Sequence, residues 1–307
     1  MKQLLHYTKY IFVFSFLAFA LSSCEIINPS EEIPFYLRID SISFIDSTKS
    51  PVGPAKAGTQ KITDAWVFVD GIFVGTYELP ATFPVLAGPG HHTVRVSAGI
   101  LLSAQSTERR VYPFFTNYPI SLDSVELGKT YTIKPKSSYD PITVKYPIEA
   151  LGQFPETFEG VGTIFKYTPN SKVDTIIRTD DPSLVFDGDY SMIMEMNSTK
   201  DYMEFETVKA YSLPNNLRPT YMELNFRTDV NLNIGIYAID NNTSNVTEVN
   251  FITLVPTNNT WKKVYLNVSN ELSAFDNSKY KFFFKANHDS TLTSSKVLID
   301  NVRILYK

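Results

Sequence analysis

Cysteine is nearly absent from this sequence of 307 residues, because Cys24 is the only one. A disulfide within the chain and a cysteine-rich metal site are therefore excluded. Histidine is scarce too, and no Gly-rich phosphate loop or Gly-x-Ser-x-Gly elbow occurs. Lys and Arg (28) nearly balance Asp and Glu (32), the net charge is -4, and no basic stripe stands out, so nucleic acid is not an expected partner.

Long hydrophobic runs are also missing, apart from one apolar stretch near the amino terminus from Tyr10 to Leu21. This stretch is shorter than the ~20 apolar residues that a membrane-spanning helix needs. Lys2 and Lys9 lie before it, and the small residues Ser22 and Ser23 follow it. The pattern is typical of a secretory signal peptide, which we predict to occupy residues 1–23.

The end of this segment resembles the lipobox of bacterial lipoproteins, in the run Leu21-Ser22-Ser23-Cys24. The resemblance implies cleavage before Cys24 and acylation of its thiol, with residues 24–34 as a polar tether to the outer membrane, on its periplasmic or its outer side. The other interpretation is an ordinary cleavage site with a chance cysteine.

A second resemblance concerns glycosylation. Asp-Ser-Thr at Asp46 and Asp289 resembles the O-glycosylation signal of exported Bacteroidota proteins.

Short alternating runs bounded by Gly, Pro, Asn and Asp recur along the rest of the chain, and apolar residues at helical spacing are almost absent. Such a pattern predicts an all-β protein of sandwiches or barrels. A Pro-rich link around residues 135–147 divides the chain into two domains, 35–137 and 138–307.

The first domain contains Asp70-Gly71 between two β-rich runs, which predicts a tight hairpin. Together with Gly88-Pro89-Gly90-His91-His92 before an alternating strand, the region from Asp64 to Gly99 resembles a PEGA-type module, a small immunoglobulin-like β-sandwich of bacterial surface proteins. The resemblance implies a spacer or a domain that contacts the cell envelope, without a catalytic site.

The second domain shows cleaner alternation, as in Met222, Leu224 and Phe226, which predicts an antiparallel sandwich with one wet face on each sheet. The order of features resembles the jelly-roll domains of carbohydrate-binding modules. The residues that carry the resemblance are Phe158-Glu159-Gly160, Asp187-Gly188-Asp189-Tyr190-Ser191-Met192, Trp261-Lys262-Lys263-Val264 and Leu298-Ile299-Asp300-Asn301-Val302. Folds of this kind host many functions, so the ligand stays open.

In the last strand, Asp300 alternates in step with the apolar residues and is therefore expected to point into the core. A buried carboxylate needs a partner there. The resemblance implies a structural calcium ion held by Glu159, Asp187 and Asp300. The other interpretation is a β-bulge at Asp300 and Asn301 with hydrogen bonds to backbone groups.

A ligand face is predicted where aromatic and hydrogen-bonding side chains alternate in step with the polar residues of their strands and so point outward. The predicted ligand-binding residues are Tyr202, Glu204, Arg227, Asn233, Tyr237 and Tyr265. A wet face with ordinary surface tyrosines is the other interpretation.

We therefore predict a lipoprotein that binds glycan without catalysis. Two alternatives remain: an adhesive or structural protein that binds another envelope protein, and a glycosidase that uses Glu204 and Glu206.

Overall fold

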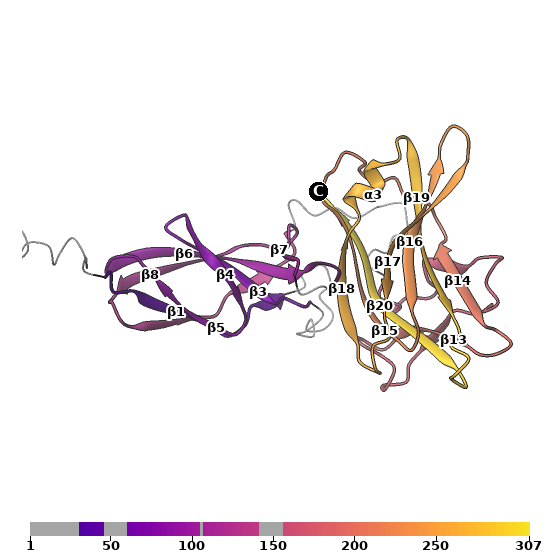
Figure 1. Ribbon diagram of the computed structural model, residues 1–307, viewed down its shortest axis with the longest axis horizontal. Coiled ribbons are helices and arrows are strands. Elements are labelled where there is room, and N and C mark those ends of the chain that lie inside the picture. The colour runs from indigo at the N-terminus through magenta and orange to yellow at the C-terminus, as the bar shows by residue number, and fades with distance from the viewer. Residues whose placement is uncertain (1–30, 46–59, 105–106, 141–155) are drawn as a thin grey trace, which may run out of the picture.

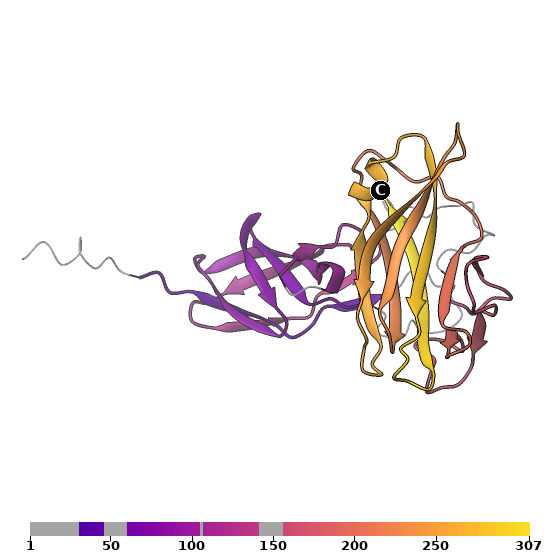
Figure 2. The same ribbon diagram turned by 45° about the vertical axis from the view of Figure 1, so that its right-hand side comes forward.

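The computed structural model describes residues 31–45, 60–104, 107–140 and 156–307. These residues fold into an elongated β domain that abuts the side of a larger β-sandwich, with the strands of the two domains running in different directions (Figures 1 and 2). The predicted signal peptide and Cys24 lie outside the described residues. In the described part, no helix has the length and apolar character to cross a membrane.

The first domain is built from two main sheets whose inward residues form its core. One sheet has the order β4-β3-β6-β7, with β8 also paired to β6; the other has the order β5-β1-β9. The strands are β1 (Phe35–Ile39), β3 (Asp64–Val69), β4 (Ile72–Glu78), β5 (Ala81–Val85), β6 (Gly90–Leu101), β7 (Arg109–Val111), β8 (Tyr118–Val125) and β9 (Thr130–Ile133). A small parallel ladder joins β2 (Ser43–Ile45) to β10 (Lys136–Ser138).

The predicted Asp-Gly hairpin joins β3 to β4, with positive φ at Asp70 (51°) and Gly71 (82°). The Asp70 carboxylate contacts His92 Nδ1 at 2.7 Å, and the other ring nitrogen of His92 lies 2.7 Å from the carbonyl of Gly88. The hydrogen bond to Asp70 raises the pKa of His92. This pair fixes the hairpin against the turn before β6, so His92 has a structural role in this domain.

The first domain extends slightly beyond the predicted boundary at residue 137. Ser138 pairs with Ile45, and Tyr139 forms a bridge to Phe115 and belongs to the core of the first domain. The link between the domains therefore begins after Tyr139.

The second domain is a jelly roll by its strand order. One sheet reads β12-β13-β20-β15-β18 and the other β11-β14-β19-β16-β17. If β13 is counted as the first strand and β20 as the eighth, the sheets read 1-8-3-6 and 2-7-4-5, which is the jelly-roll order. The strands are β11 (Phe165–Tyr167), β12 (Ile177–Thr179), β13 (Ser191–Met196), β14 (Tyr202–Thr207), β15 (Thr220–Thr228), β16 (Leu232–Asp240), β17 (Val246–Leu254), β18 (Lys262–Asn267), β19 (Ser278–Asn287) and β20 (Ser295–Tyr306).

The predicted alternation is confirmed in these strands. Met222, Leu224 and Phe226 are buried between the sheets, as are the inward residues of β16 and β18. We call β12-β13-β20-β15-β18 the docking sheet and β11-β14-β19-β16-β17 the tyrosine sheet, for reasons given below.

The outer face of the docking sheet is where the first domain packs. Tyr221, Tyr265 and Leu305 on this face belong to the same buried apolar cluster as Tyr112 and Phe114 of the first domain. The ring of Tyr112 lies 5.3 Å from that of Tyr221 and 5.0 Å from that of Tyr265. The two domains therefore share one continuous core across their contact.

A buried carboxylate, Glu223, lies at the centre of this contact. It accepts hydrogen bonds from the hydroxyls of Tyr112 and Tyr139, and Lys263 Nζ lies 3.0 Å from its Oε2. Burial alone would raise the pKa of Glu223, but the charges of Lys263 and Arg303 and the tyrosine hydrogen bonds lower it below its usual value. We call Glu223, Lys263, Arg303, Tyr112 and Tyr139 the junction cluster.

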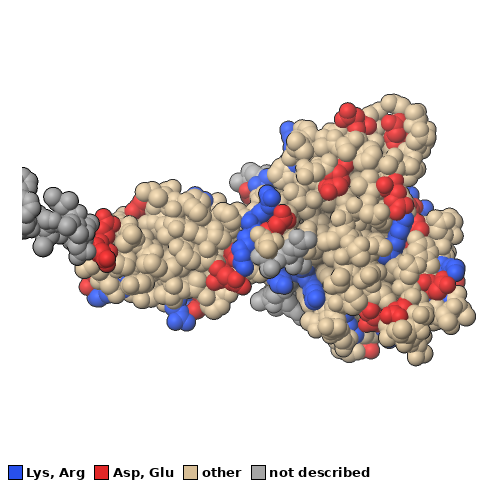
Figure 3. Space-filling view, in the orientation of Figure 1, with Lys and Arg blue, Asp and Glu red and all other residues tan. Residues whose placement is uncertain are grey.

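Charge on the molecular surface is dispersed. Most of the face in view is uncharged, and basic side chains gather at the waist between the domains next to acidic ones (Figure 3). This view shows no broad surface of one sign.

Candidate functional site

The structure gathers four of the predicted ligand-binding residues on the outer face of the tyrosine sheet. Tyr202 and Glu204 lie on β14, and Asn233 and Tyr237 lie on β16, all pointing away from the core. Strand β19 runs between β14 and β16 and completes this surface. We call it the tyrosine face.

The prediction that Arg227 and Tyr265 share this face is wrong, because both lie on the docking sheet. Tyr265 does point outward from the sandwich, but the first domain covers it and its side chain is 1% exposed. Its hydroxyl donates to Gln60 and accepts from the Lys61 N–H. Arg227 donates to the Ser183 carbonyl on the other side of the sandwich from the tyrosine face. Strand parity alone did not reveal which outward face was covered.

Glu204 fixes the two tyrosines of the face. The Tyr202 hydroxyl donates to Glu204 Oε2 at 2.8 Å, and the Tyr237 hydroxyl donates to Oε1 at 2.6 Å. Burial raises the pKa of Glu204, but hydrogen bonds from Tyr237 and Tyr202 and the charge of Lys285 bring that pKa below its usual value. Burial and the bond to Glu204 raise the pKa of both tyrosines, so they remain donors. The two rings are thereby held in place before any ligand binds.

Gly235 and Phe283 form the floor of the face. They are directly opposite each other on β16 and β19, and Phe283 is fully buried although it lies outside the main core. A Cβ added to Gly235 would come within 2.4 Å of the Phe283 ring and 2.2 Å of the Val249 carbonyl oxygen. The glycine therefore leaves the space that the aromatic ring of Phe283 occupies, and an aromatic ring placed over a glycine stabilises it in a strand.

The Tyr237 ring packs against Phe283, with ring centres 4.7 Å apart. Lys285 Nζ lies 4.5 Å from the centre of the Phe283 ring and 2.8 Å from Glu248. Sequence reasoning missed Gly235, Phe283 and Lys285. The run Phe282-Phe283-Phe284 hides the alternation of β19, although Lys281 and Lys285 on either side mark Phe283 as outward.

Glu206 does not pair with Glu204 as a catalytic acid would. Its carboxylate lies 2.6 Å from Lys281 Nζ and 3.3 Å from Lys166 Nζ. Glu204 is held ionised by two hydroxyl donors, whereas glycoside hydrolysis requires one carboxylic acid with a raised pKa. The arrangement favours binding over hydrolysis.

The predicted calcium residues lie close together but their oxygens accept hydrogen bonds from the chain. Asp300 accepts from the Ser191 hydroxyl (2.8 Å), the Asp187 N–H (3.2 Å) and the Asn301 N–H (2.6 Å). Glu159 accepts from the N–H groups of Asp189 and Tyr190. Calcium prefers six to eight oxygen ligands, and no group of three or more acidic, His or Cys side chains in the described residues is placed to hold a metal.

The alternative interpretation of Asp300, a β-bulge, describes the observed backbone. The pairing of β15 with β20 shifts register between Glu223 and Asn225, and Asn301 has a φ of 50°. In this arrangement the three residues do not fit a calcium ion. The calcium site stays a prediction from the sequence.

Asp300 gives a testable pH dependence. Burial raises its pKa to about 7 despite its three hydrogen bonds. Between pH ~4 and ~7 the folded protein therefore holds a proton that the unfolded chain releases, so the free energy of unfolding should fall by about 1.4 kcal/mol per pH unit as pH rises through this window. The measurement is the difference in unfolding free energy between the wild type and Asp300→Asn at several pH values.

The slope of this difference is the readout, since the substitution itself shifts stability by a constant amount. The same measurement on Asp180→Asn, at an exposed aspartate without a side-chain hydrogen bond among the described residues, serves as the control. A bound calcium ion would keep Asp300 ionised, so stability that instead falls with decreasing pH and responds to chelator would contradict the bulge interpretation.

Comparison with known proteins gave similarities only among solved structures. No family model and no curated protein matches the chain. A family 61 carbohydrate-binding module in complex with β-1,4-galactotriose shares 12% identity over 50% of this chain and 97% of the module, with a TM-score of 0.34. A family 28 module specific for non-crystalline cellulose shares 16% identity over 50% of this chain and 93% of the module, with a TM-score of 0.36.

A xylan-binding family 22 domain from Paenibacillus barcinonensis shares 12% identity over 50% of this chain and 92% of that domain, again with a TM-score of 0.36. These identities and scores are low. The assignment of the second domain as a jelly roll therefore rests on its own strand order.

Proposed function

We propose that this protein is a non-catalytic glycan-binding protein of the cell envelope, and that the tyrosine face is its binding surface. The observation that carries the proposal is the set of two tyrosines fixed by one carboxylate on the outward side of a jelly-roll sheet. A sugar ring has apolar C–H faces that stack on aromatic rings and hydroxyls that bond to amides, carboxylates and ammonium groups. Asn233 and Lys285 supply such groups next to the rings, while Glu204 holds the two tyrosine hydroxyls in place.

The position of the first domain supports the same surface. Among the described residues, the hydrogen bonds and ring contacts between the domains all end on the docking sheet. Of the two outer sheet faces, that of the docking sheet is thereby occupied at its centre. The tyrosine face is the one with partly exposed aromatic rings.

Attachment to the outer membrane through lipid on Cys24 belongs to the proposal and rests on the sequence alone. A tether of residues 24–34 would then hold the first domain near the lipid and carry the jelly roll beyond it. The first domain acts as a spacer in this arrangement, in line with its resemblance to envelope modules.

The test is a glycan array followed by titration calorimetry with residues 25–307, which retain every described residue. Tyr237→Ala should weaken binding of the bound oligosaccharide about tenfold or more, which corresponds to 1.4 kcal/mol or more, because it removes a stacking surface and a donor to Glu204. Tyr237→Phe should retain most of the affinity because it keeps the ring.

The matched control is Tyr167→Ala, an exposed tyrosine on β11 that lies outside the tyrosine face. An array on which nothing binds would reject the proposal and favour a protein partner. Hydrolysis of any array glycan that disappears in Glu204→Gln would favour the glycosidase alternative instead.

A further inference from the structure

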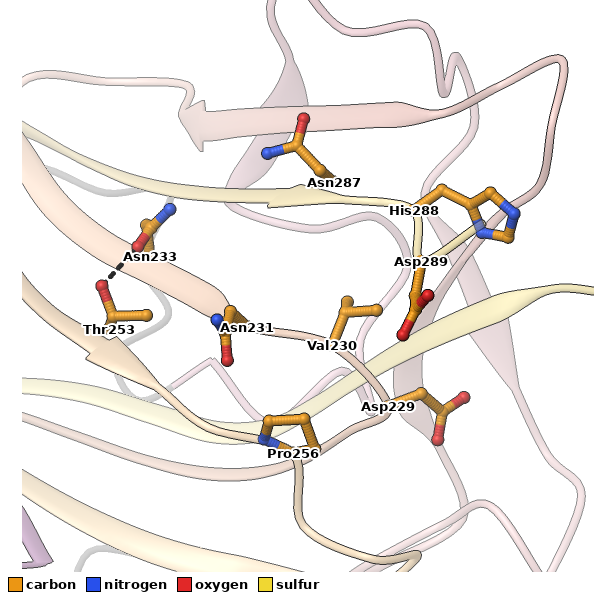
Figure 4. Close-up of a pocket in the computed structure, with 9 residues that line it drawn as sticks. All are labelled: Asp229, Val230, Asn231, Asn233, Thr253, Pro256, Asn287, His288 and Asp289. Carbon is orange, nitrogen blue, oxygen red and sulfur yellow. Dashed lines mark hydrogen bonds between the residues drawn. The ribbon is translucent and has the colours of Figure 1, made fainter. Parts of the chain in front are cut away.

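A polar pocket of about 590 Å³ opens at one end of the tyrosine face (Figure 4). Its lining comes from the turn between β15 and β16, the start of β16, the end of β17 and the end of β19. The lining residues are Asp229, Val230, Asn231, Asn233, Thr253, Pro256, Asn287, His288 and Asp289. In Figure 4, Asn233 and Thr253 lie on one side of the pocket and His288 and Asp289 on the other.

Strand register makes the pocket continuous with the tyrosine face. Asn287 on β19 is the cross-strand partner of Tyr202, and Asn233 on β16 lies between Lys285 and Thr253. These side chains belong to the same outward rows as the tyrosines. A chain molecule that crosses the tyrosine face toward this end therefore meets the pocket.

The amides of the pocket are available to a ligand. The Asn233 side chain accepts from the Thr253 hydroxyl at 2.6 Å. Asn231 and Asn287 are exposed, and neither side chain has a hydrogen bond within the part of the chain that the structure describes. An amide can donate and accept at once, which suits vicinal sugar hydroxyls.

Charge in the pocket is negative, because its lining contains two carboxylates and no Lys or Arg. The Lys296 N–H donates to Asp229 at 2.9 Å, and Thr291 donates to Asp289 through its N–H and its hydroxyl. The hydrogen bonds from Thr291 hold the pKa of Asp289 below its ordinary value. A uronate or sulfate group placed in this pocket would meet two carboxylates and no Lys or Arg side chain.

We infer that this pocket is a subsite for an uncharged sugar unit, so that the protein selects neutral glycans over uronate-containing or sulfated ones. The inference rests on the proposed function, since the remaining units of the chain lie on the tyrosine face. Asn231, Asn233 and Asn287 bond the hydroxyls of the sugar, and Asp229 and Asp289 repel anionic units.

The test compares neutral cello-, xylo-, manno- and galacto-oligosaccharides with oligogalacturonate, alginate and sulfated oligosaccharides. Each probe is titrated against residues 25–307 of the wild type and of the variants named below. The wild type should bind neutral probes only. Asn231→Ala/Asn287→Ala should weaken that binding about tenfold with no change in melting temperature, whereas Asn242→Ala in the turn after β16 should have no effect. Asp229→Asn/Asp289→Asn should reduce the difference in affinity between uronate probes and neutral probes.

Wild-type binding of a uronate or sulfated probe as tight as that of neutral probes would overturn the inference. So would neutral binding that is lost in Tyr237→Ala but unchanged in Asn231→Ala/Asn287→Ala, and this second outcome leaves the proposed function standing. If no probe binds, both fail together.

Discussion

Replacing Glu223 with alanine is expected to lower the free energy of unfolding by about 3–5 kcal/mol, the usual cost of removing one partner from a buried ion pair. The change removes the carboxylate that offsets the charges of the buried side chains of Lys263 and Arg303. It also removes the acceptor of the hydroxyls of Tyr112 and Tyr139. Urea denaturation of residues 25–307 measures the effect.

The matched control is Glu195→Ala, which lies on the same sheet and removes an exposed pair with Lys296. Exposed pairs contribute about 0–1 kcal/mol, so this variant should stay close to the wild type. Equal effects of the two substitutions would show that the junction cluster does not stabilise the contact between the domains.

Substituting Gly235 with alanine is expected to reduce stability by about 1–3 kcal/mol or more, the range for overpacking. The added methyl group would overlap the Val249 carbonyl and the Phe283 ring. Because Phe283 supports Tyr237, the substitution should also disturb the tyrosine face and weaken glycan binding. Urea denaturation and calorimetric titration on the same sample give both quantities.

Gly88→Ala is the control for this substitution, since a Cβ at Gly88 would meet nothing within 4 Å and its φ is not positive. It should leave stability and binding nearly unchanged. A Gly235→Ala variant with full stability and full affinity would contradict the role of Phe283 as the floor of the face.

Most of the fold could be predicted from the sequence because strand alternation is strong where one face is buried. Met222, Leu224 and Phe226, and likewise the inward residues of β16 and β18, fall where the period of two places them. The Asp-Gly hairpin at Asp70 was also predictable, since few residues adopt its positive φ.

The candidate site was predictable only in part, because alternation identifies outward residues without revealing what covers them. Tyr265 and Tyr237 both alternate with apolar residues and so point outward. Yet Tyr265 is buried against the first domain, whereas Tyr237 contributes to the tyrosine face. Likewise, the alternation of Met222 and Leu224 places Glu223 outward without showing that it is buried. Its burial depends on Tyr112 and Tyr139, which are distant in the sequence.

The pocket residues escaped the sequence analysis for a similar reason. Asn231 and Asn287 are ordinary polar residues at strand ends, and only the antiparallel pairing of β16 with β19 brings those ends together. For Asp300 the sequence did reveal the need for a partner, but both a metal ion and a bulge could meet it. The structure meets it with Ser191 and backbone N–H groups.

The domain contact decides which outer sheet face of the jelly roll is covered. With Tyr112 and Phe114 packed against Tyr221, the docking sheet cannot offer its centre to a glycan. Among the described residues, the first domain thereby contacts one side of the jelly roll and does not reach the tyrosine face or its pocket, where we propose that a glycan binds.

Hydroxyl-radical footprinting of residues 25–307, with and without a bound neutral oligosaccharide, tests the central claim most directly. The account predicts that Tyr202 and Tyr237 become protected from oxidation, while Tyr167 on β11 and Phe73 on the first domain do not change. Protection confined to Phe73 and its neighbours, or no change at Tyr202 and Tyr237 under saturating oligosaccharide, would contradict it.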